Sequence, residues 1–480
     1  MRLLGPSAPP GPVVTGGQAR GLDEPRGPVT SGWPLTALLM LYPLWWALGM
    51  GTLILFVLPI PMVVHLWRRR PVATPPGFGI WLLFLFWLLA STIMLPANPP
   101  GTLPNTVSSR LLSVGFALAG YLAATVILLY AGNLTEREFP RRKLVRQLGF
   151  FFVVVLGGGL LGTFAPTFGF TSLVERLLPQ RIASNGFVSS LVHPAASQLQ
   201  DVLGFSSPRP SAPFGYTNTW GNCLALLIGW FVVSWLHKAG GPRRLVGLIL
   251  LALAAIPIVY SLNRGLWIGL GLIIAFMALR LAMRGHIALL GGVIVGLLLV
   301  GALVAASPLA TIIQARFDNP KSNAIRAFTL DRTLEVVQYS PVLGFGGPRA
   351  ALGSSNSIAI GADAKCPRCG NPTLGSNGQL WLLLIAQGGG GAALYVGFFL
   401  RSLWAYRRDP TPIGDAGLLA LALPLFFMFV YNALTMPLVI SFLSIALLWR
   451  NQRDEDVPEE PRALPAAIAG AAVRVTGGRG

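Results

Sequence analysis

Long apolar runs separated by short polar segments dominate the chain from Trp33 to Trp449. A helix that crosses a bilayer needs roughly 20 mostly apolar residues, whereas an amphipathic helix shows polar residues on one face. The runs therefore predict an all-α, polytopic membrane protein with about twelve spanning helices. The predicted spans are 34–49, 50–67, 78–96, 107–131, 148–167, 215–236, 245–261, 264–283, 286–306, 378–400, 412–431 and 433–449.

The first two runs leave two hypotheses open. Gly49 and Gly51 stand at their junction, and prolines 43, 59 and 61 interrupt them. They form either two separate spans or a single broken helix, because glycine and proline interrupt helices. The choice matters, since merging the two runs would invert the direction of every later span.

Composition agrees with a membrane protein. The chain is 53% hydrophobic and 11% charged, whereas a soluble protein carries about 25% charged residues. A net charge of +19 would suggest nucleic acid in a soluble protein. In a membrane protein it marks basic loops on the cytoplasmic side, so we expect membrane lipids and no nucleic acid as partners.

The basic clusters set the expected orientation. With twelve spans, Arg68-Arg69-Arg70, Arg141-Arg142-Lys143 and Arg407-Arg408 fall on one side, which should be the cytoplasm. We therefore expect a multi-pass protein of the cell membrane with both termini cytoplasmic. Residues 1–32 and 451–480 are polar or rich in Pro, Gly and Ala, and they predict disordered tails around a transmembrane domain at 33–450. The first thirty residues hold no apolar stretch, so no cleavable signal peptide is expected.

The opposite side carries two long segments, about 168–214 and about 307–377. Loops of this length are usually functional or disordered. Within the second segment, apolar residues recur at helical spacing from Ala324 to Tyr339. This pattern predicts an amphipathic helix that lies on the outer surface.

Acidic residues are absent from the interior of the predicted spans, which disfavours an ion-coupled transporter. Three arginines instead belong to the outer side. Arg264 stands at the junction of two spans, Arg209 precedes another, and Arg326 begins the amphipathic stretch. Each alone could be an arginine that reaches lipid headgroups or solvent. Together they suit a lipid-linked diphosphate, because the guanidinium fork binds phosphate oxygens in pairs and stays charged.

The same residues carry a resemblance to a known family. In order, they are the Arg209-Pro210…Phe214…Asn218 element, the Ser261-x-x-Arg264-Gly265 element, and an outer loop with Arg326 and the turn from Ser340 to Gly346. Ser376-Asn377-Gly378-Gln379-Leu380 then opens the next span. In this order the chain resembles the O-antigen ligase and O-antigen polymerase superfamily of membrane glycosyltransferases, over roughly residues 200–400.

The resemblance implies a GT-C-like membrane enzyme that is metal-independent, inverting and without a cofactor. Such enzymes transfer a glycan from a polyprenyl-diphosphate carrier to a glycan or lipid acceptor outside the cytoplasmic membrane. Carried over by motif, Arg264 and Arg326 would hold the diphosphate with Arg209 in support. Ser376 and Asn377 would complete the catalytic set.

One position departs from the family pattern. Ligases of the family usually have a His-Asn pair where this chain has Ser376-Asn377, and that histidine is proposed to activate the acceptor hydroxyl. Serine does not serve as a general base near neutral pH. The departure favours a polymerase or an actinobacterial-type relative over a strict ligase. The outer-side candidates for a base are His193, Asp331, Glu335 and Asp363, and spacing supports none of them.

Cys366-Pro367-Arg368-Cys369 lies in the second outer segment. Its alternatives are a local disulfide or two free thiols, half of a zinc site, and a redox pair. A disulfide suits an oxidising exterior. No second half of a zinc site and no thioredoxin-like pattern accompany the pair, so we expect no metal site.

Three functions remain open from the sequence. The leading hypothesis is a glycosyltransferase that transfers or polymerises a lipid-linked glycan in the synthesis of cell-surface polysaccharide. The alternatives are a flippase or exporter of lipid-linked glycans and a non-catalytic scaffold of an envelope assembly complex. A flippase should carry charges along several spans, whereas this chain concentrates them at one face.

Overall fold

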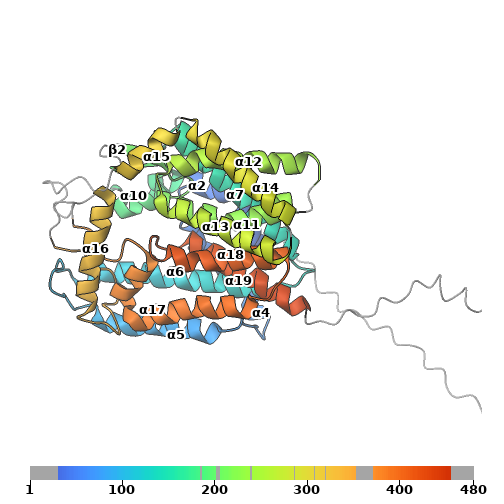
Figure 1. Cartoon of the computed structure of the whole chain (residues 1–480). Coiled ribbons are helices and arrows are strands. Elements are labelled where there is room, and N and C mark those ends of the chain that lie inside the picture. The colour runs from blue at the N-terminus through green and yellow to red at the C-terminus, as the bar shows by residue number, and fades with distance from the viewer. Residues whose placement is uncertain are drawn as a thin grey trace, which may run out of the picture.

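The computed structural model describes residues 31–183, 186–201, 206–237, 240–285, 287–307, 309–318, 321–352 and 371–455. Cys366, Cys369 and Asp363 lie outside the described residues, as do most of the two predicted tails. The described chain is a bundle of helices with one small strand pair (Figure 1).

The elements run in the following order. They are α1 (Trp33–Met40), α2 (Tyr42–Ala47), α3 (Ile54–Val57), α4 (Pro59–Arg68), α5 (Phe78–Ser91), η1 (Thr92–Met94), α6 (Val107–Asn133), α7 (Arg141–Phe164), α8 (Leu173–Leu177), α9 (Gln180–Ala183), α10 (Gly186–Val192), β1 (Ser197–Asp201), β2 (Ser206–Pro210), α11 (Thr217–Phe231), η2 (Val232–Leu236), α12 (Pro242–Tyr260), α13 (Arg264–Met283), α14 (Ile287–Ala305), α15 (Leu309–Asp318), α16 (Lys321–Val337), α17 (Gln379–Tyr406), α18 (Pro412–Phe427) and α19 (Met436–Glu455).

The helices agree with a protein that crosses a membrane several times. Within the described residues, six helices are long and apolar enough to span a bilayer, namely α6, α7, α11 with η2, α12, α13 and α17. Four shorter apolar helical segments accompany them. Large apolar side chains remain exposed on α12 and α13, and only 17% of the most apolar part of α13 is buried. Such faces suit lipid, where an apolar surface carries no cost.

The first two apolar runs cross the bundle twice. A side chain at Gly32 would touch Phe139, which precedes α7, and the Gly32 amide donates to Tyr130 near the end of α6. Gly49, by contrast, abuts Ser172 at the start of α8. The chain then returns along α4 to Arg69, which pairs with Glu138 after α6. The structure therefore supports the hypothesis of two separate passes through the bundle, and the chain reverses direction at Gly49.

The core lies around α19, which packs against α6, α18 and α11. Nearly every side chain of α19 from Leu438 to Trp449 is buried. A layer of aromatic rings centred on Trp81 joins α5, α6, α17 and α19, and Trp81 donates to Thr125 Oγ1 at 2.7 Å. Tight packing of this kind holds the ends of the helices in fixed positions.

The two ends of the bundle differ in charge chemistry. At one end Glu136 pairs with Arg141 and Arg450, and Asp415 pairs with Arg284. At the other end lie α16 and the ribbon of β1 and β2, and α16 runs crosswise to the long helices (Figure 1). The helix expected at 324–339 is thus present as α16 and begins three residues earlier.

One detail differs from the sequence expectation. The fold is not purely helical, because β1 and β2 form an antiparallel ribbon within the first long segment. Short polar residues alternate there and leave too little apolar surface for a buried helix. That segment also holds α8, α9 and α10.

A break within α17 receives the Ser340–Gly346 turn. Gly388 has φ +65°, and the helix resumes after it. The amides of Phe345 and Gly346 donate to Ile385 and Ala386 carbonyls at 2.8 and 2.7 Å. The carbonyl groups that the break leaves without a partner in the helix thereby gain hydrogen bonds. The turn and the break in the helix are therefore complementary in shape and hydrogen bonding.

Candidate functional site

Arg264 is the first residue of α13 and follows a strained turn. Leu262 has φ +53°, a left-handed conformation that residues with a branched side chain rarely adopt. The side chain of Leu262 is buried, with only 3% of its surface exposed. Such strain persists where the surroundings enforce it and often marks functional sites. Arg264 itself is half-buried. The N-terminus of α13 also carries partial positive charge, which favours an anion there.

Arg209 lies beside this turn. It extends from β2 and is only 6% exposed. Its Nε donates to the carbonyl oxygen of Ser261 at 2.6 Å, and its Nη1 donates to Oε1 of Gln200. The ribbon and the α12–α13 turn are thus joined through this arginine. The two motifs that sequence placed far apart become neighbours in space.

Tyr431 connects these elements. Its hydroxyl donates to Oδ1 of Asn263 at 2.5 Å, and Nδ2 of Asn263 donates to Oδ1 of Asn218 at 3.3 Å. A side chain added at Gly265 would come within 2.9 Å of the Tyr431 hydroxyl oxygen. The glycine of the Ser-x-x-Arg-Gly element is therefore required for close approach of this tyrosine.

Arg326 reaches the same place from α16. Burial lowers the pKa of Arg326 from its ordinary value, Tyr431 opposes that change, and the positive charge of Arg264 adds to it. The charges of Arg326 and Arg209 act on the Tyr431 hydroxyl, and the charge of Arg264 acts on Arg326. The three guanidinium groups therefore form one positively charged cluster beside Tyr431.

The Ser376–Gln379 segment supports this cluster from one side. Nδ2 of Asn377 donates to the carbonyl oxygen of Arg326 at 3.0 Å, and the Gln379 amide donates to the Tyr431 carbonyl at 2.8 Å. Ser376 is exposed. Asn377 thus holds the backbone of α16 at Arg326, whereas the exposed side chain of Ser376 lines a groove beside it.

The structure brings together most of the residues that the sequence singled out. Arg209 and Arg326 lie close to Tyr431, Arg264 lies close to Arg326, and Asn377 contacts the backbone of Arg326. We refer to these three arginines with Tyr431 as the arginine cluster. Ser376 lines a neighbouring groove with Gln387.

The candidate bases lie elsewhere or are committed to other contacts. His193 Nδ1 and Glu175 Oε2 are 2.8 Å apart, near Gly49. Glu335 pairs with Arg332 on the exposed side of α16, and Asp331 is also exposed. Among the described residues, no group of three His, Cys, Asp or Glu side chains could hold a metal ion.

Sequence reasoning missed Tyr431 and Asn263 as site residues. Tyr431 follows an apolar run in which an aromatic residue is unremarkable, and only the packing of Gly265 against it reveals its position. Asn263 stands within the Ser-x-x-Arg-Gly element. A polar residue at the junction of two spans is the sequence feature that could have marked Asn263 as a site residue.

A model of the protein family described as O-antigen ligase matches residues 248–364. The match includes the Ser-x-x-Arg-Gly element, α13 and α16, and it supports membership of the chain in the O-antigen ligase/polymerase family. A search of curated proteins found no match.

Replacing Tyr431 with phenylalanine should reduce the ligase- or polymerase-type activity that the family match supports about 10–100-fold, because the buried oxygen of Asn263 loses its donor. The ring packing against Phe427, at 4.9 Å between centroids, is kept. The activities of purified variants in vesicles measure the effect. Tyr406→Phe is the matched control, because that hydroxyl is buried and makes no hydrogen bond within the described structure. Equal rates for both variants would contradict the role of Tyr431.

Proposed function

We propose that this protein is a membrane glycosyltransferase that transfers or polymerises a polyprenyl-diphosphate-linked glycan on the outer face of the cytoplasmic membrane. The observation that carries the proposal is the clustering of Arg209, Arg264 and Arg326 beside Tyr431, at the end of the bundle where α11, α13 and α17 begin. Helix N-termini and guanidinium groups both favour a diphosphate.

In the proposed reaction, the acceptor hydroxyl oxygen bonds to the anomeric carbon of the donor glycan from the face opposite the diphosphate. The bond from that carbon to the diphosphate oxygen breaks, and polyprenyl diphosphate leaves with the electron pair. The hydroxyl proton is released to water as the new bond forms. Arg264 and Arg326 stabilise the charge that develops on the leaving group, and Arg209 supports them. Attack from the opposite face inverts the anomeric centre, and no metal is required.

Ser376 and Asn377 take supporting parts in this proposal. Asn377 orients Arg326 through its backbone carbonyl. Ser376 is too weak a base to accept a proton near neutral pH, and it instead contacts the acceptor beside the cluster. A flippase is less suited to this arrangement, because the three arginines gather at one end of the bundle rather than along a path through it.

Deletion of the gene tests the function in cells. A polymerase predicts surface glycan shortened to single repeats, and a ligase predicts complete glycan that stays on its lipid carrier. Accumulation of lipid-linked glycan on the cytoplasmic face would instead indicate a flippase. Unchanged surface glycan would contradict the proposal.

The proposed orientation has its own test. We expect a membrane-impermeant thiol reagent added to intact cells to label Cys366 or Cys369 after mild reduction. Cys223 is buried with no exposed surface and should stay unlabelled in the folded protein. Labelling of the pair only from the cytoplasmic side would refute an outer location for the second long segment and cytoplasmic termini.

A further inference from the structure

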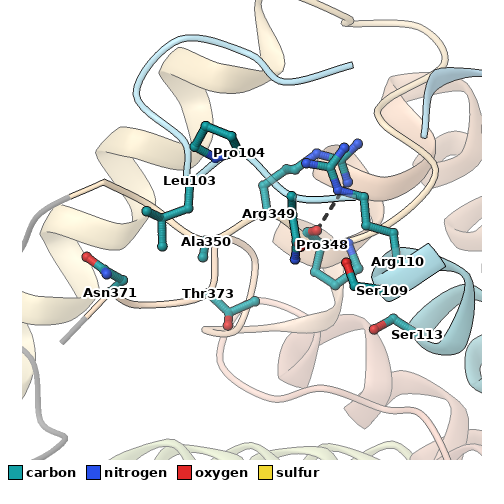
Figure 2. Close-up of a pocket in the computed structure, with 11 residues that line it drawn as sticks. Leu103, Pro104, Ser109, Arg110, Ser113, Pro348, Arg349, Ala350, Asn371 and Thr373 are labelled. Atoms are coloured by element: carbon teal, nitrogen blue, oxygen red, sulfur yellow. Dashed lines mark hydrogen bonds between the residues drawn. The ribbon is translucent and has the colours of Figure 1, made fainter. Parts of the chain in front are cut away.

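A second pair of arginines lies outside the arginine cluster. Arg110 from α6 and Arg349 from the loop after α16 are 5% and 2% exposed. Both guanidinium groups donate to the same two carbonyls, of Leu95 and Ala97, at distances between 2.5 and 3.3 Å. They are therefore direct neighbours, as Figure 2 shows.

Within the part of the chain that the structure describes, the pair is positively charged and has no carboxylate beside it to neutralise it. Among the described residues, no carboxylate forms an ion pair with Arg110 or Arg349. Burial lowers the pKa of Arg349 to about 10, and the charge of Arg110 contributes to the decrease. Nε of Arg349 is buried and has no hydrogen-bond partner among the residues that the structure describes. Carbonyl oxygens orient the two groups but leave two like charges together, which is costly unless an anion is present.

A cavity of about 310 Å³ adjoins the pair. The lining has polar side chains from Asn105, Ser109, Ser113, Asn371 and Thr373. Figure 2 shows Ser109 and Ser113 on the side of Arg110. The cavity is large enough for a phosphate group, and its hydroxyl and amide groups are suited to phosphate oxygens.

An apolar groove of about 420 Å³ begins beside this cavity. The two spaces share Ser113, Pro348 and Thr373, and the groove continues along Leu112 and Phe116 of α6. Its position on a predicted spanning helix suits a hydrocarbon chain. A positively charged cavity next to an apolar groove matches a lipid phosphate, which has a charged headgroup and an apolar chain.

The groove and the arginine cluster lie on opposite sides of one short segment. Ser376 lines the groove, whereas the next residue, Asn377, bonds to Arg326. Gln379 donates from its side chain to the Tyr121 hydroxyl in the groove at 2.8 Å and from its amide to the Tyr431 carbonyl. A transferase needs two substrates, and this arrangement presents two anionic places with the Ser376–Gln379 segment between them.

We propose that the Arg110–Arg349 cavity and its groove bind the acceptor as a phosphate-bearing lipid, with the phosphate at the arginines and the hydrocarbon chain in the groove. The inference rests on the proposed transferase function, in which the arginine cluster holds the donor. It commits the enzyme to two lipid-phosphate substrates, as polymerisation of lipid-linked repeats requires.

The test avoids removing the arginines, because Arg349 also binds six backbone carbonyls and its loss would disturb the fold. Ser113→Asp instead places a negative charge at an exposed residue shared by the cavity and the groove. Ser108→Asp is the matched control, because it adds the same charge on the same helix at an exposed residue outside both linings.

Native mass spectrometry of the full chain in detergent with a polyprenyl monophosphate counts the bound lipids. We expect two for the wild type and for Ser108→Asp, one for Ser113→Asp and one for Arg264→Ala. In vesicles, Ser113→Asp should raise the KM for the lipid acceptor at least tenfold and leave the KM for the donor within twofold. Excess inorganic phosphate should not displace the lipids.

The contrary outcomes separate the two proposals. Two lipids on Ser113→Asp, or equal losses in Ser113→Asp and Ser108→Asp, would overturn the acceptor site and leave the donor site standing. Displacement by inorganic phosphate would overturn the lipid-binding groove. A single wild-type lipid that Ser113→Asp loses and Arg264→Ala retains would support the acceptor site and contradict the diphosphate role of Arg264.

Discussion

Replacing Arg264 with alanine is expected to reduce glycan transfer by about 10³-fold or more, because one preorganised charge on the leaving diphosphate is lost. The variant should still fold, since Arg264 is only half-buried and stands at the first position of α13. Arg264→Lys should fail almost as completely. Lysine keeps the charge but presents a point donor in place of the planar fork that binds two phosphate oxygens.

Vesicle assays with polyprenyl-diphosphate glycan measure this effect. Arg332→Ala is the matched control, because Arg332 also lies at this end of the bundle but is 41% exposed and pairs with Glu335. It should transfer at nearly the wild-type rate. Normal transfer by Arg264→Ala would exclude Arg264 from diphosphate binding, and equal losses in both variants would indicate a general charge effect.

Gly388→Ala is expected to destabilise the protein by about 3 kcal/mol or more, since its backbone conformation is essentially restricted to glycine. The strain has two sources. The residue has φ +65° and ψ −171°, and an added Cβ would lie 2.3 Å from the Val342 carbonyl oxygen. The turn at Ser340–Gly346 would no longer pack into the break of α17. The position of α16 and of Arg326, which depends on this turn, would change as well.

Gly397→Ala on the same helix provides the comparison. There an added Cβ meets only Ile80, at 3.8 Å, and alanine favours a regular helix by about 0.5–1 kcal/mol over glycine. Thermal unfolding in detergent should therefore separate the two variants in opposite directions. Similar unfolding temperatures for both would contradict the proposed fit between the turn and the helix break.

The sequence predicted the features that depend on local pattern. Apolar runs mark the spanning helices because each must satisfy its own backbone in lipid. The spacing of Leu330, Leu334 and Val337 predicts α16, because apolar residues three and four positions apart lie on one face of a helix. Arg264 was conspicuous for a similar reason, since a charge next to a spanning helix is rare.

Contacts between residues far apart in the chain could not be predicted from the sequence. Arg110 stands near the start of a predicted span and Arg349 in a loop far along the chain, yet both bind the carbonyls of Leu95 and Ala97. Tyr431 gains its role only through Gly265 and Asn263. Local pattern contains no information about such pairings, because they arise from how the helices pack.

The most direct test of the central claim uses the purified full-length chain in sealed vesicles with a polyprenyl-diphosphate glycan and a lipid-linked acceptor. The measurement is the release of polyprenyl diphosphate together with growth of the acceptor glycan. We expect one carrier released for each glycan transferred, without added metal, and no release with Arg264→Ala. Glycan that crosses the membrane while still attached to its carrier, with no release, would contradict a transferase.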